Sequence, residues 1–188
     1  MLERIKTEIS RCAGRVLGRR VGRFAREQDG AAAIEFALVA APFLALLFAI
    51  LETAFIFFAS QTLEAAVADS GRLIMTGQAQ TAGWTAATFK NQVCARIFGL
   101  FDCQNGVYVN VQKYSTFGSA TTATPYTNGQ FDSTKTAYNA GDPGEIQVVQ
   151  LFYQWPIYVS LFSMNLSNQN GNKRLLVATS VFRNEPYK

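Results

Sequence analysis

The sequence predicts an α+β fold in which one long N-terminal helix packs on a small antiparallel β-sheet domain. Three observations support this prediction. An apolar run of helical length begins at Ala31, apolar residues at helical spacing follow it, and β-rich runs occupy the C-terminal half. The 188 residues amount to one domain with an appendage, by the usual prior of roughly 150 residues per domain.

Residues 31–59 are apolar apart from a few positions, chiefly Glu35 and Glu52. As a helix this segment would span about 40 Å, which is long enough to cross a bilayer with tilt. A buried helix of a soluble protein is the alternative, but the chain has little other apolar sequence to cover such a helix on every side. We therefore expect a transmembrane helix over 31–59. Pro42 lacks an amide hydrogen and crowds the carbonyl of Leu38, which predicts a kink.

Residues 1–30 form a basic leader, because Met1 to Arg26 contains eight of the seventeen Lys and Arg residues. Arg72 is the first cation beyond the apolar run, so the positive-inside rule predicts a cytoplasmic N-terminus and an extracytoplasmic C-terminal part. From Ala31 onward, nine basic residues balance nine acidic ones. The body therefore has no excess charge for binding nucleic acid.

Residues 60–82 continue the helix as an extension or stalk. One stripe at helical spacing contains Leu63, Val67, Leu73 and Ile74, while Gln61, Glu64, Asp69 and Arg72 lie largely off it. We expect a single helix from about Ala31 to about Thr76, with an amphipathic second half and Gly77 as its stop. This amphipathic half is the expected cover for the apolar face of the sheet.

Residues 83–188 are predicted to form the β-rich extracytoplasmic domain. A short helix is expected over about Thr85–Phe98. The strands expected after it are Val107–Val111, Ile146–Tyr153 with a short extension over Tyr158–Phe162, and Leu175–Phe182. Ser115–Gly144 is dense in Thr, Ser, Asn and Gly, so it is expected to be a long surface loop, and residues 171–173 form a turn.

The chain has no histidine, which removes Ser-His-Asp and Cys-His catalysis and His-containing zinc sites. Gly-rich phosphate loops and basic-aromatic nucleic-acid surfaces are also absent as patterns. We therefore expect no enzyme, no cofactor and no metal site. Cys94 and Cys103 lie beyond the membrane, where a disulfide is the natural pairing, with two buried free thiols as the alternative. Cys12 lies in the leader, on the reducing side.

The junction between leader and apolar run has an unusual combination of residues. Gly30 is followed by the small Ala31, and Glu35 stands five places after the glycine at the start of the apolar stretch. This arrangement resembles a type IV prepilin. With Asp29 to Ala37 and the nearby Pro42, it is more narrowly similar to the TadE-like pseudopilins of tight-adherence (Flp) pilus systems. The specific similarity covers about Asp29 to Gly77; the rest is similar only in size, in its β-rich character and in its closing residues.

The resemblance implies that an integral-membrane prepilin peptidase cuts between Gly30 and Ala31 and removes the leader. It further implies a type IV pilin-like fold and partners among the other minor and major Tad pilins and the inner-membrane assembly platform. Glu35, with Phe36 beside it, would serve subunit assembly by pairing with a neighbour's N-terminal ammonium. The implied location is the bacterial inner membrane, with a periplasmic domain, and the extracellular pilus after assembly.

Alternatives remain at each of these positions. Glu35 can instead reach water at the cytoplasmic interface, close to Arg26. Glu52, at the far interface, is expected to be solvated by headgroups rather than to form a second intersubunit pair. The chain can also be an uncleaved single-pass anchored binding or sensing module. A secreted protein cut after Ala66-Val67-Ala68 fits poorly, because the apolar segment is about twice the usual 7 to 15 residues of a signal.

Overall fold

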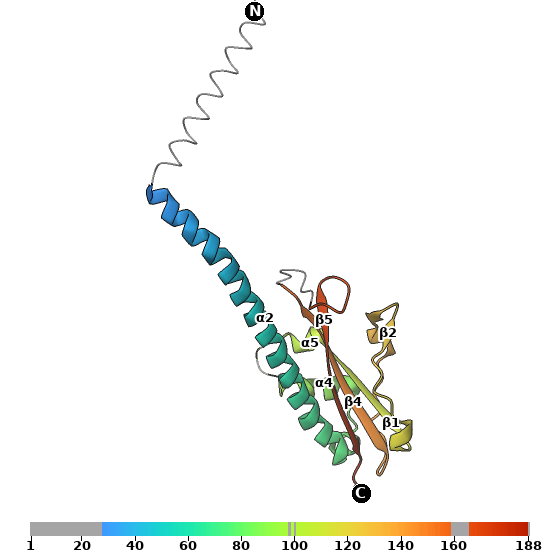
Figure 1. Ribbon diagram of the computed structural model, residues 1–188. Helices are drawn as coiled ribbons and strands as arrows, with labels where there is room; N and C mark the ends of the chain where they lie inside the picture. Colours follow the sequence, from blue (N-terminus) through green and yellow to red (C-terminus); the bar gives the residue numbers. More distant parts are fainter. Residues whose placement is uncertain (1–27, 98, 100, 159–165, 188) are drawn as a thin grey trace, which may run out of the picture. The chain divides into compact units, whose positions relative to one another are not determined.

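The computed structural model describes residues 28–97, 99, 101–158 and 166–187 (Figure 1). The chain divides into two compact units, Met1–Phe48 and Ala49–Lys188. The helices are α2 (Gln28–Met75), α3 (Gln78–Thr81), α4 (Ala86–Cys94) and α5 (Cys103–Gly106), with short 3-10 turns η1 (Phe117–Ser119) and η2 (Ser133–Lys135). The strands are β1 (Val107–Tyr114), β2 (Tyr126–Thr127), β3 (Gln130–Phe131), β4 (Ile146–Pro156) and β5 (Lys173–Arg183).

Helix α2 confirms the predicted single long helix. It runs without a break from Gln28 to Met75, so its described part begins three residues before the expected start. It ends where the sequence predicts, because Gly77 adopts a left-handed conformation with φ of 78°. The amide of Gly77 donates to the carbonyl of Ile74 at 3.0 Å, which satisfies one of the free carbonyls at the helix end.

The three long strands form an antiparallel sheet, as predicted, and their order in the sheet is β1-β4-β5. Strand β4 is central, and both neighbours run against it over their full lengths. At one end of the β4–β5 ladder Pro156 pairs with Lys173, and at the other end Ile146 pairs with Arg183. Because ten residues of strand separate these ends, they lie about 33 Å apart. Strand β4 extends three residues beyond its predicted end at Tyr153.

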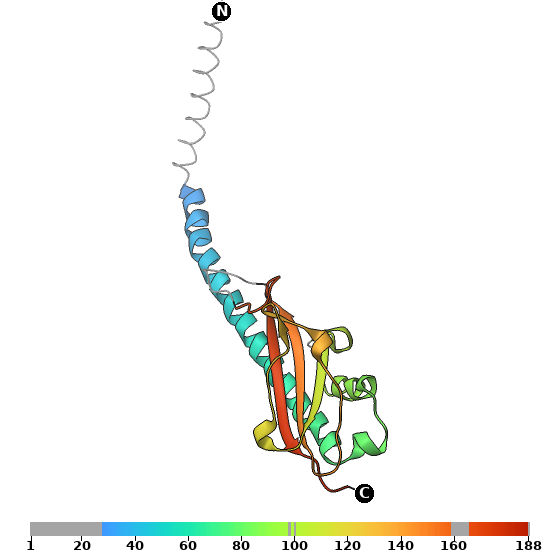
Figure 2. The same ribbon diagram turned by 90° about the vertical axis from the view of Figure 1, so that its right-hand side faces the viewer.

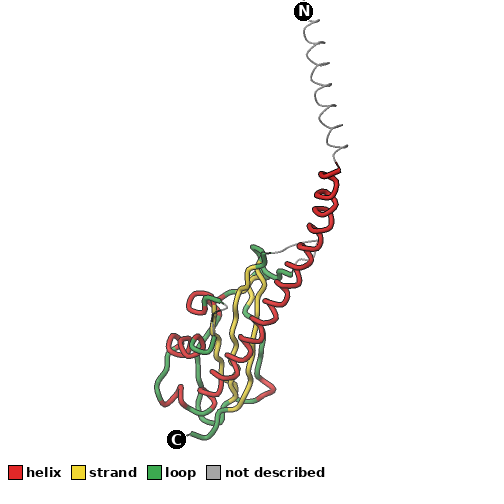
Figure 3. The backbone as a smooth tube through the Cα atoms, turned by 90° about the vertical axis from the view of Figure 1, so that its left-hand side faces the viewer, coloured by secondary structure: helices red, strands yellow, loops and turns green. Residues whose placement is uncertain are grey.

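The second half of α2 covers one face of this sheet, also as predicted (Figures 2 and 3). The buried stripe of α2 is spaced by three and four residues and includes Ile56, Ala59, Leu63, Ala66, Val67 and Ile74. Facing it from the strands are Val107, Val111, Val149, Leu151, Leu176 and Ala178. Leu73, expected on the stripe, is only half-buried. Helix α4 adds Phe89 and Val93 to the same core.

The opposite face of the sheet is covered by part of the segment 115–144. The composition of 115–144 predicts a long surface loop, but residues 126–131 within it form the small β2–β3 hairpin. Its Phe131 packs with Phe152 and Leu175 in a second apolar cluster. The turn of this hairpin is Asn128-Gly129, and both residues have positive φ, as a two-residue hairpin turn requires.

Helix α4 is shorter than predicted, and the predicted strand extension after β4 is described only at its first residue. Helix α4 has the expected start, since the Thr85 side chain caps it by accepting from the amide of Thr88. It ends at Cys94 rather than near Phe98, because the disulfide and the following turn redirect the chain. Phe98 itself, and all but the first residue of the predicted extension Tyr158–Phe162, lie outside the described residues.

Candidate functional site

The N-terminal part of α2 presents its apolar side chains outward. Its best 18-residue window has a mean hydropathy of 2.5, and no part of that window is buried within the protein. The exposed large side chains between residues 34 and 51 are Ile34, Phe36, Leu38, Val39, Phe43, Leu44, Leu46, Leu47, Phe48, Ile50 and Leu51. So much apolar surface on all sides of one helix needs lipid or other apolar helices to cover it. The helix thus has the length and composition of a single membrane anchor.

The predicted processing junction lies within α2. Gly30 and Ala31 are both helical, so their peptide bond is not in an extended segment in this structure. A Cβ added at Gly30 would meet no heavy atom within 4 Å outside its chain neighbours and the backbone of its own helix turn. Glycine weakens a helix by about 1 kcal/mol relative to alanine, so this turn is easier to open than its neighbours. An extended chain at the junction therefore requires local unwinding.

Glu35 and Phe36 lie one turn after the junction, and both are exposed. Phe36 is 74% exposed, which leaves its ring free for contacts outside the chain. Ala31 and Glu35 are four residues apart and so share one face of the helix. Within the described residues Glu35 has no ion pair, and Arg26, its nearest cation in the leader, lies outside them. The structure of one chain thus leaves the Glu35 carboxylate at the surface.

Pro42 lies inside α2, and the helix continues on both sides of it. Its ring nitrogen cannot donate to the carbonyl of Leu38, so one hydrogen bond of the helix is missing at this turn. The predicted kink at Pro42 stays a prediction.

Glu52 has a contact that the sequence analysis did not foresee. Its side chain is only 7% exposed, and it accepts a hydrogen bond of 2.5 Å from the backbone N–H of Tyr158. The expectation of a carboxylate solvated by headgroups is therefore wrong for this structure. The reason is that α2 already packs on the domain at this level, with Ile56 buried one turn later. Glu52 thus joins the helix to the end of β4.

The Cys94–Cys103 disulfide is present, as predicted. It connects the last residue of α4 to the first residue of α5, and the two Cα atoms are 5.5 Å apart. Asp102 caps α5 by accepting from the amide of Asn105, which holds Cys103 at the start of the turn. The bond therefore fixes the connection from α4 into β1. Cys12 lies outside the described residues.

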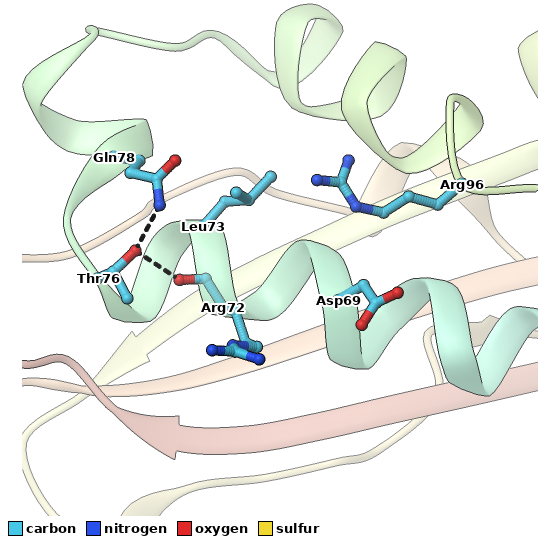
Figure 4. A pocket seen from close by; sticks show the side chains of 6 residues that line it. All are labelled: Asp69, Arg72, Leu73, Thr76, Gln78 and Arg96. Atoms are coloured by element: carbon cyan, nitrogen blue, oxygen red, sulfur yellow. Dashed lines mark hydrogen bonds between the residues drawn. The ribbon is translucent and has the colours of Figure 1, made fainter.

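A pocket of about 360 Å³ lies beside the end of α2 (Figure 4). Its lining residues are Asp69, Arg72, Leu73, Thr76, Gln78 and Arg96. The Thr76 hydroxyl donates to the carbonyl of Arg72 at 2.8 Å and accepts from Gln78 at 3.0 Å, which closes one wall. The pocket contains none of the sequence-predicted site residues. The lining combines one acidic and two basic side chains in an open depression, so it indicates no particular class of ligand.

A charged cluster holds together the end of the sheet formed by residues 146 and 183. Lys113 lies 3.1 Å from Glu145 and 3.4 Å from Asp142. The pKa of Glu145 is lowered, first by the hydrogen bond that the Asp142 amide donates and then by Lys113. The pKa of Lys113 is raised, chiefly by its hydrogen bond to Glu145. All three side chains are partly exposed, so the cluster is a surface ion-pair network rather than a buried site.

These features define a class of protein: a small β-sheet domain joined to a single apolar helix suited to anchor it in a membrane. The match to a known family is more specific. The family model of TadE-like proteins matches residues 30–72, which confirms the resemblance to TadE-like pilins over this segment. No curated protein and no solved structure matches the chain. The family match and the apolar helix together support a membrane-anchored protein associated with the Tad pilus.

Proposed function

We propose that this protein is a minor pilin or pseudopilin of a Tad (Flp) pilus that takes part in pilus assembly, adhesion or priming. The observation that supports this most is where the family match begins. It starts at Gly30, the glycine of the predicted junction, and covers the apolar helix and most of its extension. The match thus contains Gly30, Ala31, Glu35 and Phe36, the residues to which the proposal gives a role.

Processing is the first step of this proposal. The basic leader, residues 1–30, stays in the cytoplasm and is removed by the prepilin peptidase after Gly30. The mature chain then begins at Ala31 in the bacterial inner membrane, with residues 31–59 as the transmembrane helix and 60–82 as its extension. The domain of residues 83–188 lies in the periplasm. Because Gly30 is helical, the proposed cut requires that this turn of α2 opens locally.

Assembly is the second step. Once Ala31 is the N-terminus, its ammonium and the Glu35 carboxylate occupy one face of the helix, one turn apart. A carboxylate inside a bilayer costs about 2.5–3.5 kcal/mol on insertion scales, so it requires a partner when water is withdrawn. The N-terminal ammonium of a neighbouring pilin is that partner, and exposed Phe36 packs beside it. The pair sets the axial register of subunits leaving the bilayer.

The alternative is an uncleaved single-pass module whose helix only anchors a binding or sensing domain. The continuity of the helix through Gly30 favours this alternative, because the junction is not presented as an extended segment. N-terminal sequencing of the membrane-extracted protein separates the candidates. Ala31 as the first residue supports the pilin, Met1 supports the uncleaved module, and Asp69 would indicate a secreted protein.

A further inference from the structure

One end of the sheet brings an exposed aromatic ring close to two neighbouring cations that follow it about fifteen residues later in the sequence. The β4–β5 register pairs Trp155 with Arg174 and Pro156 with Lys173. Just beyond this pair, the amide of Ile157 donates to the carbonyl of Asn172 at 2.8 Å. Tyr158 follows and is 81% exposed, the highest value among the exposed large apolar side chains. We call Tyr158, Lys173 and Arg174 the basic aromatic end.

This end lies at a defined level along α2. The Tyr158 amide donates to Glu52, which stands 21 residues after Ala31 on the same helix. That length is about 31 Å at ~1.5 Å per residue, close to the thickness of the hydrocarbon core of a bilayer. The opposite end of the sheet is held near the end of α2, since the Glu185 amide donates to the carbonyl of Met75 at 2.9 Å. The basic aromatic end is thus bonded to α2 at Glu52, and the opposite end of the sheet is bonded to it at Met75.

The charges of this end are not compensated by ion pairs within the described residues. Lys173 is exposed and only approaches the Gln154 amide oxygen at 3.5 Å, while Arg174 donates to the carbonyl of Leu166 at 2.9 Å. Two carboxylates lie at this end: Glu52, which is buried and accepts from the Tyr158 amide, and Asp102, which accepts from the Asn105 side chain at 2.7 Å.

Three carboxylates lie at the opposite end of the sheet. Asp142 and Glu145 form the cluster with Lys113 there, and Glu185 follows β5. Within the described residues, the basic aromatic end therefore presents two cations, Lys173 and Arg174, that have no ion pair.

We propose that the basic aromatic end docks on the headgroup layer of the membrane that holds α2, with Lys173 and Arg174 against the phosphates of anionic lipids. A tyrosine suits this level, because its ring tolerates the apolar side of the interface while its hydroxyl stays hydrated. Basic side chains are attracted to anionic bilayers over about a Debye length. This docking rests on the proposed membrane anchoring.

The test uses the full-length protein with Cys12→Ser, reconstituted into vesicles of phosphatidylcholine with or without phosphatidylglycerol. A nitroxide is attached at Tyr158→Cys, and its accessibility to oxygen and to a water-soluble nickel complex reports its depth. Phe117→Cys is the matched control. Phe117 is also an exposed aromatic residue, at 60%, but it follows the end of β1 near Ile146, at the opposite end of the sheet. A label at Val39→Cys, an exposed position within the apolar helix, reports the anchor itself.

The expected result is a label at 158 that lies at the headgroup level in anionic vesicles, while the label at 117 remains in water. A label at 158 as accessible to the nickel complex as that at 117 would overturn the docking. If the label at 39 is in lipid in that case, the anchoring stands and only the docking fails. Protection at 158 that depends on the protein-to-lipid ratio would instead indicate a second protein copy and would also overturn it.

Charge removal gives an independent measurement that does not depend on the label at Tyr158 being tolerated. Lys173→Gln is compared with Arg183→Gln, because the two residues occupy opposite ends of the same strand. Each cation near an anionic surface changes the binding about fivefold. Lys173→Gln should lower the ratio of docked to undocked domain about fivefold, measured with a label on Asn170→Cys. Arg183→Gln should leave this ratio unchanged, and equal effects of the two variants would overturn the proposal.

Discussion

The backbone N–H of Tyr158 donates a hydrogen bond to the carboxylate of Glu52, 106 residues earlier in the chain. This bond ties the end of the central strand to the helix at the point where the domain begins to cover α2. The bond is a specific contact between the helix and the sheet, because a buried carboxylate needs a hydrogen-bond donor at a defined place. It also explains why an acidic residue is compatible with the apolar sequence around it.

Loss of this acceptor should destabilise the domain. Glu52→Ala leaves the Tyr158 amide without its acceptor. Because this bond is only partly buried and Tyr158 is 81% exposed, we expect the loss of a typical hydrogen bond, about 0.5–1.5 kcal/mol. For a chain of this size the melting temperature should fall about 2–4 °C per kcal/mol. Thermal unfolding in detergent, with Glu64→Ala as an exposed control on the same helix, measures the effect. Glu52→Gln keeps an acceptor oxygen and should lose less; equal melting temperatures for Glu52→Ala and Glu64→Ala would contradict the role of this bond.

The sequence predicts the long helix and the main strands, but it does not predict the Glu52–Tyr158 hydrogen bond. Periodic patterns predicted α2 and the strands β1, β4 and β5, because burial on one face repeats along each element. Gly77 was predictable as a helix stop because a left-handed residue is usually a glycine. The Glu52–Tyr158 bond was not predictable from the sequence, because its donor is a backbone amide whose position depends on the strand register. The same register brings Tyr158 and Lys173 to one end of the sheet.

The β2–β3 hairpin was missed although its signal is present in the sequence. Asn128-Gly129 is the pair most typical of a two-residue hairpin turn, and it lies between Tyr126 and Phe131. The flanking strands have only two residues each, too few for a visible alternation of apolar and polar side chains. Helices α3 and α5, with four residues each, are likewise too short to show a helical period.

Reduction of the disulfide should loosen the connection between α4 and β1. Closing so short a loop stabilises the folded state by roughly 2.5–3 kcal/mol on the loop-entropy estimate. A non-reduced peptide map of the native protein should show Cys94 linked to Cys103, with Cys12 absent from the mature chain. Reductant should lower the melting temperature of the wild type but not that of the double variant Cys94→Ser, Cys103→Ser. Two alkylatable thiols in native material would refute the bridge.

Substitution at the junction should block processing without disturbing the fold. A branched side chain hinders the fit of the opened chain at the cut, so Gly30→Val should leave a full-length precursor in the membrane. The substitution should not clash with other parts of the described fold, because a Cβ added at Gly30 would have no atom within 4 Å outside its neighbours and the backbone of its own helix turn. Gly118→Val, at another glycine with open surroundings, is the control and should be shortened normally. Normal shortening of Gly30→Val, seen by gel mobility and mass spectrometry, would count against the pilin proposal.

The Lys113 cluster predicts how stability changes with pH. The pKa of Glu145 is lower in the folded protein than its ordinary value of 4.5, so the carboxylate stabilises the fold above that pH. This stabilisation is lost as the pH falls through the lowered pKa. The pKa of Lys113 is raised above 10.5, so its contribution is present below that pH and is lost as the pH rises through the raised value.

Between these limits Glu145→Gln should therefore melt below the wild type, and the difference should disappear in acid. Melting curves across pH measure it. Glu185→Gln is the control, since Glu185 is exposed at the same end of the sheet and has no ion pair within the described residues. A difference that persists at a pH well below 4.5 would show that the Glu145 substitution acts through packing instead.

Glu35 provides the test that separates assembly from anchoring. In a single inserted chain its exposed carboxylate can reach water on the cytoplasmic side, whereas in a bundle of helices it is desolvated and must meet a neighbour's N-terminal ammonium. Glu35→Ala should therefore be made, inserted and folded at normal levels, with the Cys94–Cys103 bond intact. Its insertion should be at least as favourable as that of the wild type, because the substitution removes a charge from the apolar segment.

Assembly of the Glu35→Ala variant should nevertheless fall. The carboxylate is needed only when subunits meet, because the N-terminal ammonium of the neighbouring pilin then has no partner without it. Cross-linking or co-purification with partner pilins, and the number of surface pili, are compared with wild type at matched protein level. Glu64→Ala, which removes an exposed carboxylate farther along the same helix, should leave these yields unchanged. An unchanged assembly yield for Glu35→Ala would reduce Glu35 to a carboxylate at the membrane interface, and the uncleaved anchored module would then be the better account of this protein.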